Sequence, residues 1–293
     1  MMTNEIYLLT GGEATRLKPL SEGIPKALLT IQGEKIIDLI IAKFLIIGDF
    51  HFNLICSIKH KQYWEEYAQN SNIDVNIIFE TEKLDTAGYI IKHLNDFPES
   101  FYCMNGDLLL DVNLEDFILQ STSFSNSMIA SIEVEDPSRF GVLQVDENLN
   151  ILQFIEKPID NTYGNKISLG LYHLRKSNLK DIAYNLEIPC SFERKVFPEL
   201  SENKLLSTFT VSGHMLDVGT LESYIKAHIS TEKENWISES SEVDPSAVIE
   251  NTVILDDAII EKNTEIKNSI IGPKTRIKEG SVIQEEIIRD LTQ

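Results

Sequence analysis

The chain has 293 residues, 42% of them hydrophobic, and carries 46 Asp and Glu against 26 Lys and Arg. This length and apolar content indicate one large globular domain with a smaller appendage and exclude a disordered chain. The formal net charge of −20 argues against nucleic acid or an anionic membrane as a partner. No apolar run reaches the roughly 18–20 residues of a membrane-spanning helix.

The N-terminus and the cysteines predict a cytoplasmic protein. The first residues, MMTNEIYLL, have neither a basic flank nor a small-residue cleavage site, so we expect no export signal. Cys56, Cys103 and Cys190 lie in apolar surroundings without paired spacing, which favours reduced thiols in the core.

Short apolar runs alternate with helical patterns from about residue 4 to residue 230. The apolar runs, of the kind found in buried parallel strands, are EIYLLT (5–10), NLICSI (53–58), VNIIF (75–79) and FYCMN (101–105). Helical spacing marks residues 35–47, 62–70 and 87–94, and Asn113 is placed to cap a further helix. The alternation predicts a Rossmann-like α/β domain with an open, mostly parallel sheet and an antiparallel insertion at 133–156.

The pattern changes at about Val243. The sequence then divides into seven units: SAVIEN, TVILDD, AIIEKN, TEIKN, SIIGPK, TRIKEG and SVIQEE. A period of six with one short unit is typical of a hexapeptide parallel β-helix, which we expect to be left-handed; a few amphipathic surface strands are the alternative. Each unit would form one side of a three-sided coil. The aliphatic residue at its third position would point inward, namely Val248, Ile254, Ile260, Ile266, Ile271, Ile277 and Ile283.

These patterns divide the chain into three regions. We predict a large α/β domain at 1–230, a polar linker at 231–242 and a β-helix at 243–293. Seven units make little more than two coils, and the open end of so short a β-helix exposes unpaired strand edges. We therefore expect a homo-oligomer, with a dimer favoured.

The loop TGGEATRLKPLSEGIPKALL follows the first expected strand, so it lies at the carboxyl edge of the sheet, where ligands bind. It lacks the Lys-Ser/Thr pair of a P-loop and the third glycine of a dinucleotide fingerprint. Gly11 and Gly12 would allow close approach and unusual φ, Arg16 offers a planar fork for phosphate oxygens, and Lys26 offers a mobile point charge. On its own, the loop fits a phosphate site and a structural surface loop equally well.

Ordered motifs along nearly the whole chain resemble the sugar-1-phosphate nucleotidylyltransferases. The family signature Gly-Gly-x-Gly-Thr-Arg-Leu-x-Pro-Leu-Thr, followed by Pro-Lys, corresponds here to GGEATRLKPLS at 11–21 and Pro25-Lys26. Further family segments are matched by LDTAG (84–88), NGDLLLD (105–111), EDPSRFGVLQVD (135–146), FIEKP (154–158), FERKVFPEL (192–200) and LDVGT (216–220). SRFGV, FIEKP and FERKVFP are most similar to mannose-1-phosphate guanylyltransferases.

The resemblance implies in-line attack by a sugar-1-phosphate oxygen on the α-phosphorus of an NTP, with release of pyrophosphate. Charge neutralisation and positioning should dominate such a reaction. The implied catalytic residues are Arg16, Lys26, Asp107 and Lys157. The implied nucleotide-binding residues are Leu9, Thr10, Gly11, Gly12, Thr15, Arg16, Lys26, Glu80, Thr86, Ala87 and Gly88. Gly141, Glu156, Lys157, Ser168 and Gly170 would bind the sugar phosphate.

Magnesium is the implied cofactor, with Asp107 and Asp217 as its ligands. Both residues are expected at strand ends on the ligand edge, and Mg²⁺ binds through one or two carboxylates plus phosphate. Taken alone, Asp107 could be a turn residue and Asp217 a helix cap near Thr220. The six histidines show no paired metal spacing, so none is assigned as a ligand.

Three departures from the family pattern bear on specificity. Ala14 replaces a glycine and would strain the loop if that glycine needs positive φ. Asp85 replaces the glycine of the LGTAG segment, and Ser168-Leu169 stands where relatives often carry Asn-Ala. We expect GTP and mannose 1-phosphate as substrates. The alternatives are dTTP or UTP with glucose 1-phosphate, or a non-catalytic regulatory homologue that binds sugar nucleotides.

Overall fold

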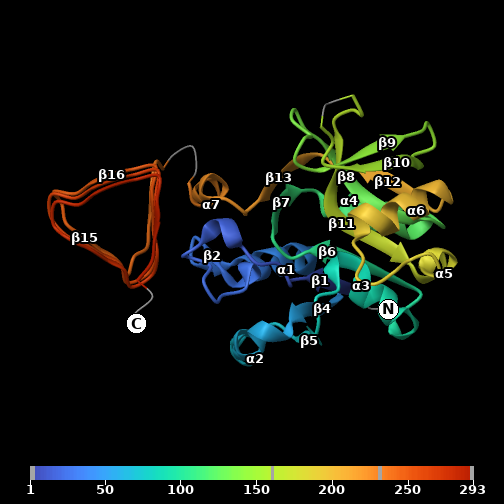
Figure 1. Ribbon diagram of the computed structural model, residues 1–293, viewed down its shortest axis with the longest axis horizontal. Coiled ribbons are helices and arrows are strands. Elements are labelled where there is room, and N and C mark those ends of the chain that lie inside the picture. The colour runs from blue at the N-terminus through green and yellow to red at the C-terminus, as the bar shows by residue number, and fades with distance from the viewer. Residues whose placement is uncertain (1–3, 160–161, 230–232, 291–293) are drawn as a thin grey trace. The chain divides into compact units, whose positions relative to one another are not determined.

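The computed structural model describes residues 4–159, 162–229 and 233–290, which form two compact units (Figure 1). The first unit comprises the residues up to Gly11 together with Ile40–Gly106 and Leu110–Met215. The second comprises Gly12–Leu39, Asp107–Leu109 and the residues from Leu216 onward. The loop segment that begins at Gly12 thus belongs to the same unit as the C-terminal part of the chain. The division into domains at residues 230 and 243 stays a prediction.

The first unit is built on a nine-stranded mixed sheet in the order β10-β9-β11-β6-β1-β4-β5, with β8 pairing both β11 and β12. The neighbouring strands β6, β1, β4 and β5 run parallel, with β5 at the edge of the sheet, as the apolar runs predict. The nine strands are β1 (Asn4–Leu9), β4 (Phe50–Ser57), β5 (Val75–Glu80), β6 (Ser100–Asn105), β8 (Ser127–Glu133), β9 (Gly141–Val145), β10 (Ile151–Glu156), β11 (Lys166–Arg175) and β12 (Leu206–Thr210).

The antiparallel part of this sheet confirms the expected insertion. Strands β9 and β10 form an antiparallel pair, and β11 runs antiparallel to β6 and β8. The register of β11 against β8 shifts between Ser168 and Tyr172, which places an irregularity in the middle of β11. Such irregularities re-aim side chains and are common beside binding sites.

Seven α-helices connect the strands among the residues that the structure describes. They are α1 (Ile36–Ile47), α2 (Lys61–Asn70), α3 (Asp85–Lys92), α4 (Leu114–Ser123), α5 (Lys176–Ala183), α6 (Phe197–Glu202) and α7 (Leu221–His228). The Asn113 side chain accepts a hydrogen bond from the Glu115 N–H, which confirms the predicted cap of α4. Cys56, Cys103 and Cys190 are free and buried, as expected. None of the helices in the described ranges is long and apolar enough to cross a membrane.

Two small pairs of strands lie outside the large sheet. They are the antiparallel pair β2 (Thr30–Ile31) and β3 (Glu34–Lys35), and the pair β7 (Leu108–Val112) and β13 (Gly213–Asp217). The second pair borders both predicted metal ligands, because Asp107 directly precedes β7 and Asp217 ends β13.

The C-terminal part of the second unit is a three-sided parallel β-helix, drawn in orange and red in Figure 1. Its sides are three parallel sheets, β14-β17-β20-β23, β15-β18-β21 and β16-β19-β22. Their strands are β14 (Trp236–Ile237), β15 (Glu242–Val243), β16 (Val248–Glu250), β17 (Val253–Ile254), β18 (Ile259–Ile260), β19 (Glu265–Lys267), β20 (Ile270–Ile271), β21 (Arg276–Ile277), β22 (Val282–Gln284) and β23 (Ile287–Ile288). Because β14 and β15 belong to these sheets, the coil begins within the segment predicted as a linker.

The hexapeptide prediction is confirmed at six of its seven inward positions and is wrong at Val248. Ile254, Ile260, Ile266, Ile271, Ile277 and Ile283 form the buried core of the coil. Val248 is 54% exposed, and Ile249 points inward instead, in register with Ile266. Stacked hydrogen bonds join residues 17 positions apart, so each coil contains two six-residue sides and one five-residue side. The short side therefore recurs in every coil, and the five-residue step from the inward Ile249 to the inward Ile254 is one such side.

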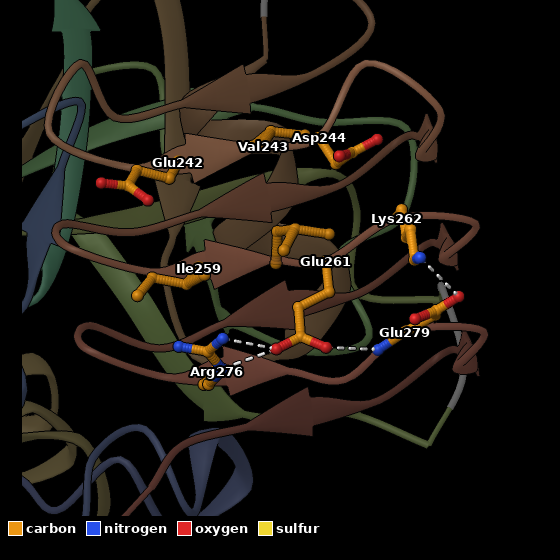
Figure 2. A pocket seen from close by; sticks show the side chains of 9 residues that line it. Glu242, Val243, Asp244, Ile259, Glu261, Lys262, Arg276 and Glu279 are labelled. Atoms are coloured by element: carbon orange, nitrogen blue, oxygen red, sulfur yellow. Dashed lines mark hydrogen bonds and ion pairs between the residues drawn. The ribbon is translucent and has the colours of Figure 1, made fainter.

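Charged side chains cover the outer face of β15-β18-β21 and pair with one another (Figure 2). The Glu261 carboxylate accepts hydrogen bonds from the Arg276 side chain and from the Glu279 N–H, and the Glu279 N–H in particular lowers the pKa of that carboxyl. Lys262 pairs with the Glu279 carboxylate at 3.3 Å. A hollow of about 610 Å³ lies over this face, and both cations of its lining, Lys262 and Arg276, are paired with glutamates.

Candidate active site

The loop from Gly12 to Lys26 lies in the second unit and starts with a tight turn. A 3₁₀ helix spans Thr15–Leu17, and the Ala14 carbonyl accepts hydrogen bonds from the Leu17 N–H and the Ser21 hydroxyl. Ala14 has φ −80° and ψ 58°, so alanine replaces glycine here without backbone strain. The unusual φ expected at Gly11 and Gly12 is wrong, because neither residue has positive φ.

Lys26 brings the two predicted metal ligands together within the second unit. It is only 6% exposed and begins the 3₁₀ helix Lys26–Leu28. Its ammonium group donates to Asp107 Oδ2 at 2.8 Å and to Asp217 Oδ1 at 2.9 Å. The two aspartate side chains remain 36% and 30% exposed, so both carboxylates are accessible to a ligand as well as paired with Lys26.

Gly219 explains why a glycine follows Asp217 in the LDVGT segment. A Cβ atom at Gly219 would lie 2.9 Å from Arg16 Nη2, 3.1 Å from Asp217 Oδ1 and 3.4 Å from Lys26 Nζ. The missing side chain thus lets the Arg16 guanidinium approach the lysine–carboxylate cluster. Sequence reasoning quoted this glycine in a motif but did not assign it to the site.

The alternative interpretation of Asp217 as a helix cap is wrong, because Thr220 caps α7. The Thr220 hydroxyl accepts a hydrogen bond from the Ser223 N–H, and the Ser223 hydroxyl accepts one from the Thr220 N–H. This capping box leaves the Asp217 side chain facing Lys26.

The donor set of the cluster suits a divalent cation. Asp107 and Asp217 supply the carboxylate oxygens that Mg²⁺ prefers, and both lie within reach of one cation because both contact Lys26. No group of three or more His, Cys, Asp or Glu that could hold a metal occurs among the described residues. The remaining ligands would therefore come from water and phosphate, as is common for Mg²⁺ sites that act on phosphate substrates.

In the first unit, Glu80 ends strand β5 and faces the backbone of Gly11. A Cβ on Gly11 would lie 3.5 Å from Glu80 Oε2. Burial, with a smaller contribution from the Asp85 carboxylate, raises the pKa of the Glu80 carboxyl to about 7. The Thr10 hydroxyl, by contrast, donates to the Ile55 carbonyl at 2.9 Å, so its side chain already has a structural partner.

The segment at the start of α3 is fixed by residues of the FERKVFPEL motif. Asp85 has φ 65°, a left-handed conformation that glycine adopts freely and aspartate tolerates, which explains how aspartate replaces the family glycine. The Thr86 hydroxyl donates to Glu193 Oε2 and accepts from the Phe192 N–H, both at 2.9 Å. The Ala87 N–H donates to the Cys190 carbonyl.

Gly88 also has a packing role in this segment. A Cβ there would lie 2.9 Å from Leu84 Cβ and 3.5 Å from the Cys190 N atom. Any nucleotide contact by residues 86–88 must therefore coexist with these structural partners.

The predicted sugar-phosphate residues Glu156 and Lys157 are adjacent in space as well as in sequence. Lys157 Nζ lies 3.2 Å from Glu156 Oε1. Lys157 has φ 49° although Pro158 follows it, a backbone state that most residues avoid and that often marks functional sites. Its side chain is 62% exposed, so the ammonium group can reach a ligand.

Gly141, Ser168 and Gly170 each have a structural role, apart from the predicted contact with a sugar. The Phe154 ring fills the space beside Gly141, where a Cβ would lie 2.3 Å from Phe154 Cζ and 3.2 Å from Glu156 Oε2. Gly170 has φ 75° at the irregularity in β11, and its N–H donates to the Ser168 hydroxyl. Their contact with a sugar stays a prediction.

Glu193 is a carboxylate that sequence reasoning missed. It lies in a π-helical turn, Phe192–Val196, a feature that frequently occurs at functional sites. Burial raises the pKa of its carboxyl, and the Glu156 carboxylate is close enough to raise it further. The signal available in the sequence was its place in the FERKVFPEL motif.

Comparisons with known proteins identify the family of this chain. The Nucleotidyl transferase family matches residues 7–234, and the GlmU-like, C-terminal hexapeptide family matches residues 226–293. The chain therefore belongs to the nucleotidyl transferase family. Members of this family generally use a divalent metal ion.

The names of individual relatives are more specific than the name of the family. The chain is 31% identical over 229 residues to the mannose-1-phosphate guanyltransferase of Gibberella zeae, which covers 74% of this chain and 61% of the relative. It is 30% identical over 225 residues to the mannose-1-phosphate guanylyltransferase catalytic subunit beta of Drosophila melanogaster, covering 74% of this chain and 60% of the relative. The matched part thus spans less than two thirds of these relatives' length.

A solved structure, HddC from Yersinia pseudotuberculosis, superposes with a TM-score of 0.64 at 27% identity. It covers 77% of this chain and 98% of HddC. A second HddC structure, complexed with GMP-PN, matches with a TM-score of 0.62.

Proposed function

We propose that this protein is a sugar-1-phosphate nucleotidylyltransferase that forms a GDP-sugar and pyrophosphate from GTP and mannose 1-phosphate. The observation that carries the proposal is the cluster in which Lys26 joins Asp107 and Asp217, with Arg16 beside them at Gly219. Such a cluster combines cations for a triphosphate with oxygen ligands for a metal, which nucleotidyl transfer requires.

The reaction needs two anions to meet. An oxygen of the sugar 1-phosphate bonds to the α-phosphorus of the NTP. The bond from that phosphorus to the oxygen bridging the β-phosphate breaks, and pyrophosphate leaves with the electron pair. Arg16 and Lys26 would neutralise the triphosphate, while Lys157 would hold the sugar phosphate. Asp107 and Asp217 would hold Mg²⁺, which when bound supplies further positive charge to the phosphate oxygens.

The choice of guanine is supported by Glu80 and by the comparisons. An ionised carboxylate accepts two hydrogen bonds side by side, and guanine offers two adjacent donors, N1–H and the N2 amino group. Glu80 lies at a strand end against the Gly11 backbone, in a setting where such a pair of bonds could form. The names of the relatives include guanyltransferase, and the HddC ligand is GMP-PN.

This role for Glu80 predicts a pH dependence. Because the Glu80 pKa is raised to about 7, the ionised form that guanine needs is a minority at pH 6 and a majority at pH 8. The KM for GTP should therefore fall by about tenfold between pH 6 and pH 8, in proportion to the ionised fraction. Asp85→Asn should shift this inflection to lower pH, because it removes a neighbouring negative charge.

Comparing GTP with UTP in Glu80→Gln separates the titration of Glu80 from the titration of GTP itself. Glu80→Gln should flatten the difference in pH profile between GTP and UTP, and should reduce the preference for GTP. An unchanged GTP-to-UTP preference in Glu80→Gln would contradict the assignment.

The two cationic side chains should affect different substrates. Arg16→Ala should weaken binding of GTP more than that of mannose 1-phosphate, because Arg16 lies beside the Lys26 cluster. Lys157→Ala should show the opposite bias, because its partner is Glu156 on the predicted sugar side. Calorimetry with each substrate would measure both effects, and unchanged GTP affinity in Arg16→Ala would remove the loop from the triphosphate site.

A pyrophosphate-release assay tests the proposal as a whole. GTP, UTP, dTTP and ATP are each combined with mannose 1-phosphate and with glucose 1-phosphate, with and without Mg²⁺. We expect the highest kcat/KM for GTP with mannose 1-phosphate and no turnover without a divalent metal. Preference for dTTP or UTP with glucose 1-phosphate would overturn the substrate assignment, and no turnover with any pair would overturn the activity.

The proposal extends to the protein's setting. Ala14, which would have strained the loop at a positive φ, has an ordinary φ and so gives the non-catalytic alternative no support. The three free, buried cysteines are consistent with a cytoplasmic location. A homo-oligomer remains our expectation, to be checked by light scattering.

A further inference from the structure

Arg289, just after the last strand of the β-helix, reaches the loop between Gly12 and Lys26. Its Nη1 atom donates to the Leu20 carbonyl at 2.8 Å and to the Glu22 carbonyl at 3.2 Å. Both residues belong to the second unit but are 269 and 267 positions away from Arg289 in sequence. A single charged donor thus binds two carbonyls, two residues apart, in the predicted triphosphate loop.

The backbone hydrogen bonds within this part of the loop use other carbonyls as acceptors. Within the loop, the Ser21 N–H donates to Leu17, the Glu22 N–H to Pro19 and the Ile24 N–H to Ser21. Arg289 supplies the hydrogen bonds to the carbonyls of Leu20 and Glu22, on either side of Ser21. Hydrogen bonds from a charged donor are stronger than neutral ones, so Arg289 is a principal constraint on this turn.

Packing and hydrogen bonds within the β-helix hold the backbone of Arg289 in place. A Cβ on Gly272 would lie 2.9 Å from Arg289 Cβ and 3.0 Å from the Ile288 carbonyl oxygen, so only glycine fits beside it. The Gly272 N–H donates to Ile288, and the Asp290 N–H donates to the Thr275 hydroxyl. The backbone on both sides of Arg289 is therefore anchored, which orients its side chain before any ligand binds.

The side of the coil next to Arg289 is also covered, unlike the other sides. Val253 and Ile270 lie in register on the β14-β17-β20-β23 sheet, beside the inward Ile254 and Ile271, yet both are completely buried. On the β16-β19-β22 side, Val248 and Val282 are 54% and 74% exposed. The covered sheet thus packs against other parts of the second unit.

Three contacts connect this covered side, through α7, to the segment that follows Lys26. The ring of Trp236 in β14 lies 5.0 Å from the ring of His228 at the end of α7. The Gln32 side chain donates to the His228 carbonyl, and the Tyr224 hydroxyl donates to the Thr30 carbonyl. The segment that follows Lys26 is therefore tied through α7 to the same side of the β-helix from which Arg289 extends.

We propose that Arg289 is a positioning residue for the triphosphate loop, so that the β-helix takes part in nucleotide binding. By fixing the carbonyls of Leu20 and Glu22, it sets the spacing between Arg16 at one end of the loop and Lys26 at the other. The ligand class is a nucleoside triphosphate, and the inference rests on the proposed function. Arg289 itself contacts the loop and not the reacting atoms.

The experiment compares Arg289→Ala with Arg276→Ala in the full-length chain. Arg276 is the matched control, because it also extends from the β-helix but pairs with Glu261 on another side of the coil, where its side chain is 61% exposed (Figure 2). Arg289→Ala should raise the KM for GTP by about tenfold, the order expected for losing charge-assisted hydrogen bonds, with kcat and the KM for mannose 1-phosphate little changed. Arg289→Lys should restore most of the difference, and Arg276→Ala should match the unmodified protein.

A merely structural role would lower the melting temperature and the amount of active enzyme without raising one KM selectively. If Arg289→Ala folds poorly, Gly272→Ala provides a second variant that displaces Arg289 while keeping its charge. An unchanged KM for GTP in an otherwise active protein would overturn the proposal.

Hydrogen exchange separates this inference from the proposed function. Amides of residues 15–26 should exchange faster in Arg289→Ala than in Arg276→Ala, whether or not the protein turns over GTP. Equal exchange in the two variants would overturn the positioning role, whereas absence of turnover in the unmodified protein would overturn only the proposed activity.

Discussion

Replacing Asp107 or Asp217 by Asn should lower turnover by about a hundredfold or more, the order seen when a key electrostatic group is lost. Both carboxylates contact Lys26, and both would supply oxygen ligands to a divalent ion. Asparagine keeps the shape of each side chain but removes its charge, which weakens metal binding directly. Each side chain is about one third exposed, at 36% and 30%, so the fold should survive the change.

The measurement is pyrophosphate release as a function of Mg²⁺ concentration. Asp111→Asn is the matched control, because Asp111 lies in β7 four residues after Asp107 but is 88% exposed and only weakly paired with Lys43 at 3.8 Å. Added Mg²⁺ should partly rescue the two site variants and leave the control unaffected. Rates close to those of the unmodified protein for either site variant would remove that residue from the metal site.

The meeting of Asp107 and Asp217 could be predicted from sequence, but their link through Lys26 could not. Each aspartate borders an expected strand end, and family motifs placed both on the ligand edge. The Lys26 contacts span 81 and 191 residues, and no local pattern specifies which cation lies between two distant carboxylates. Burial of Lys26 to 6% exposure is a tertiary property for the same reason.

Glycine positions show a similar limit. Sequence reasoning assigned conformational freedom to Gly11 and Gly12, yet neither has positive φ. Gly219 matters because of the space beside it, which depends on where Arg16 and Lys26 come to lie. Conversely, Asp85 occupies a left-handed position where relatives carry glycine, so a residue that looked like a departure in charge keeps the required backbone state.

The β-helix was recognisable from its period, whereas its exact register was not. Val248 and Ile249 are both aliphatic, so either could satisfy the inward position when a single unit is considered alone. Only stacking on Ile266 in the next coil decides between them. The contact from Arg289 to the loop is even harder to predict from the sequence, because it joins residues near opposite ends of the chain.

Replacing Lys26 by Met should have an effect as large as either aspartate substitution. Methionine fills the space of the buried lysine stem, so the change removes mainly the ammonium group. Asp107 and Asp217 would then lie close together without their shared cation, and two neighbouring carboxylates repel each other. The triphosphate would also lose a cation, and we expect turnover to fall by about a hundredfold, as for other electrostatic groups of this kind.

The decisive comparison is a double-mutant cycle between Lys26→Met and Asp217→Asn. Lys18→Met serves as the matched control, because Lys18 lies in the same loop but forms an exposed pair with Glu22 at 3.2 Å. If Lys26 and Asp217 act as one unit, the double variant should be scarcely slower than either single variant. Multiplicative losses in the double variant would mean that the two residues act independently. In that case the short contact between them would describe the ligand-free protein and not the arrangement that carries out nucleotidyl transfer.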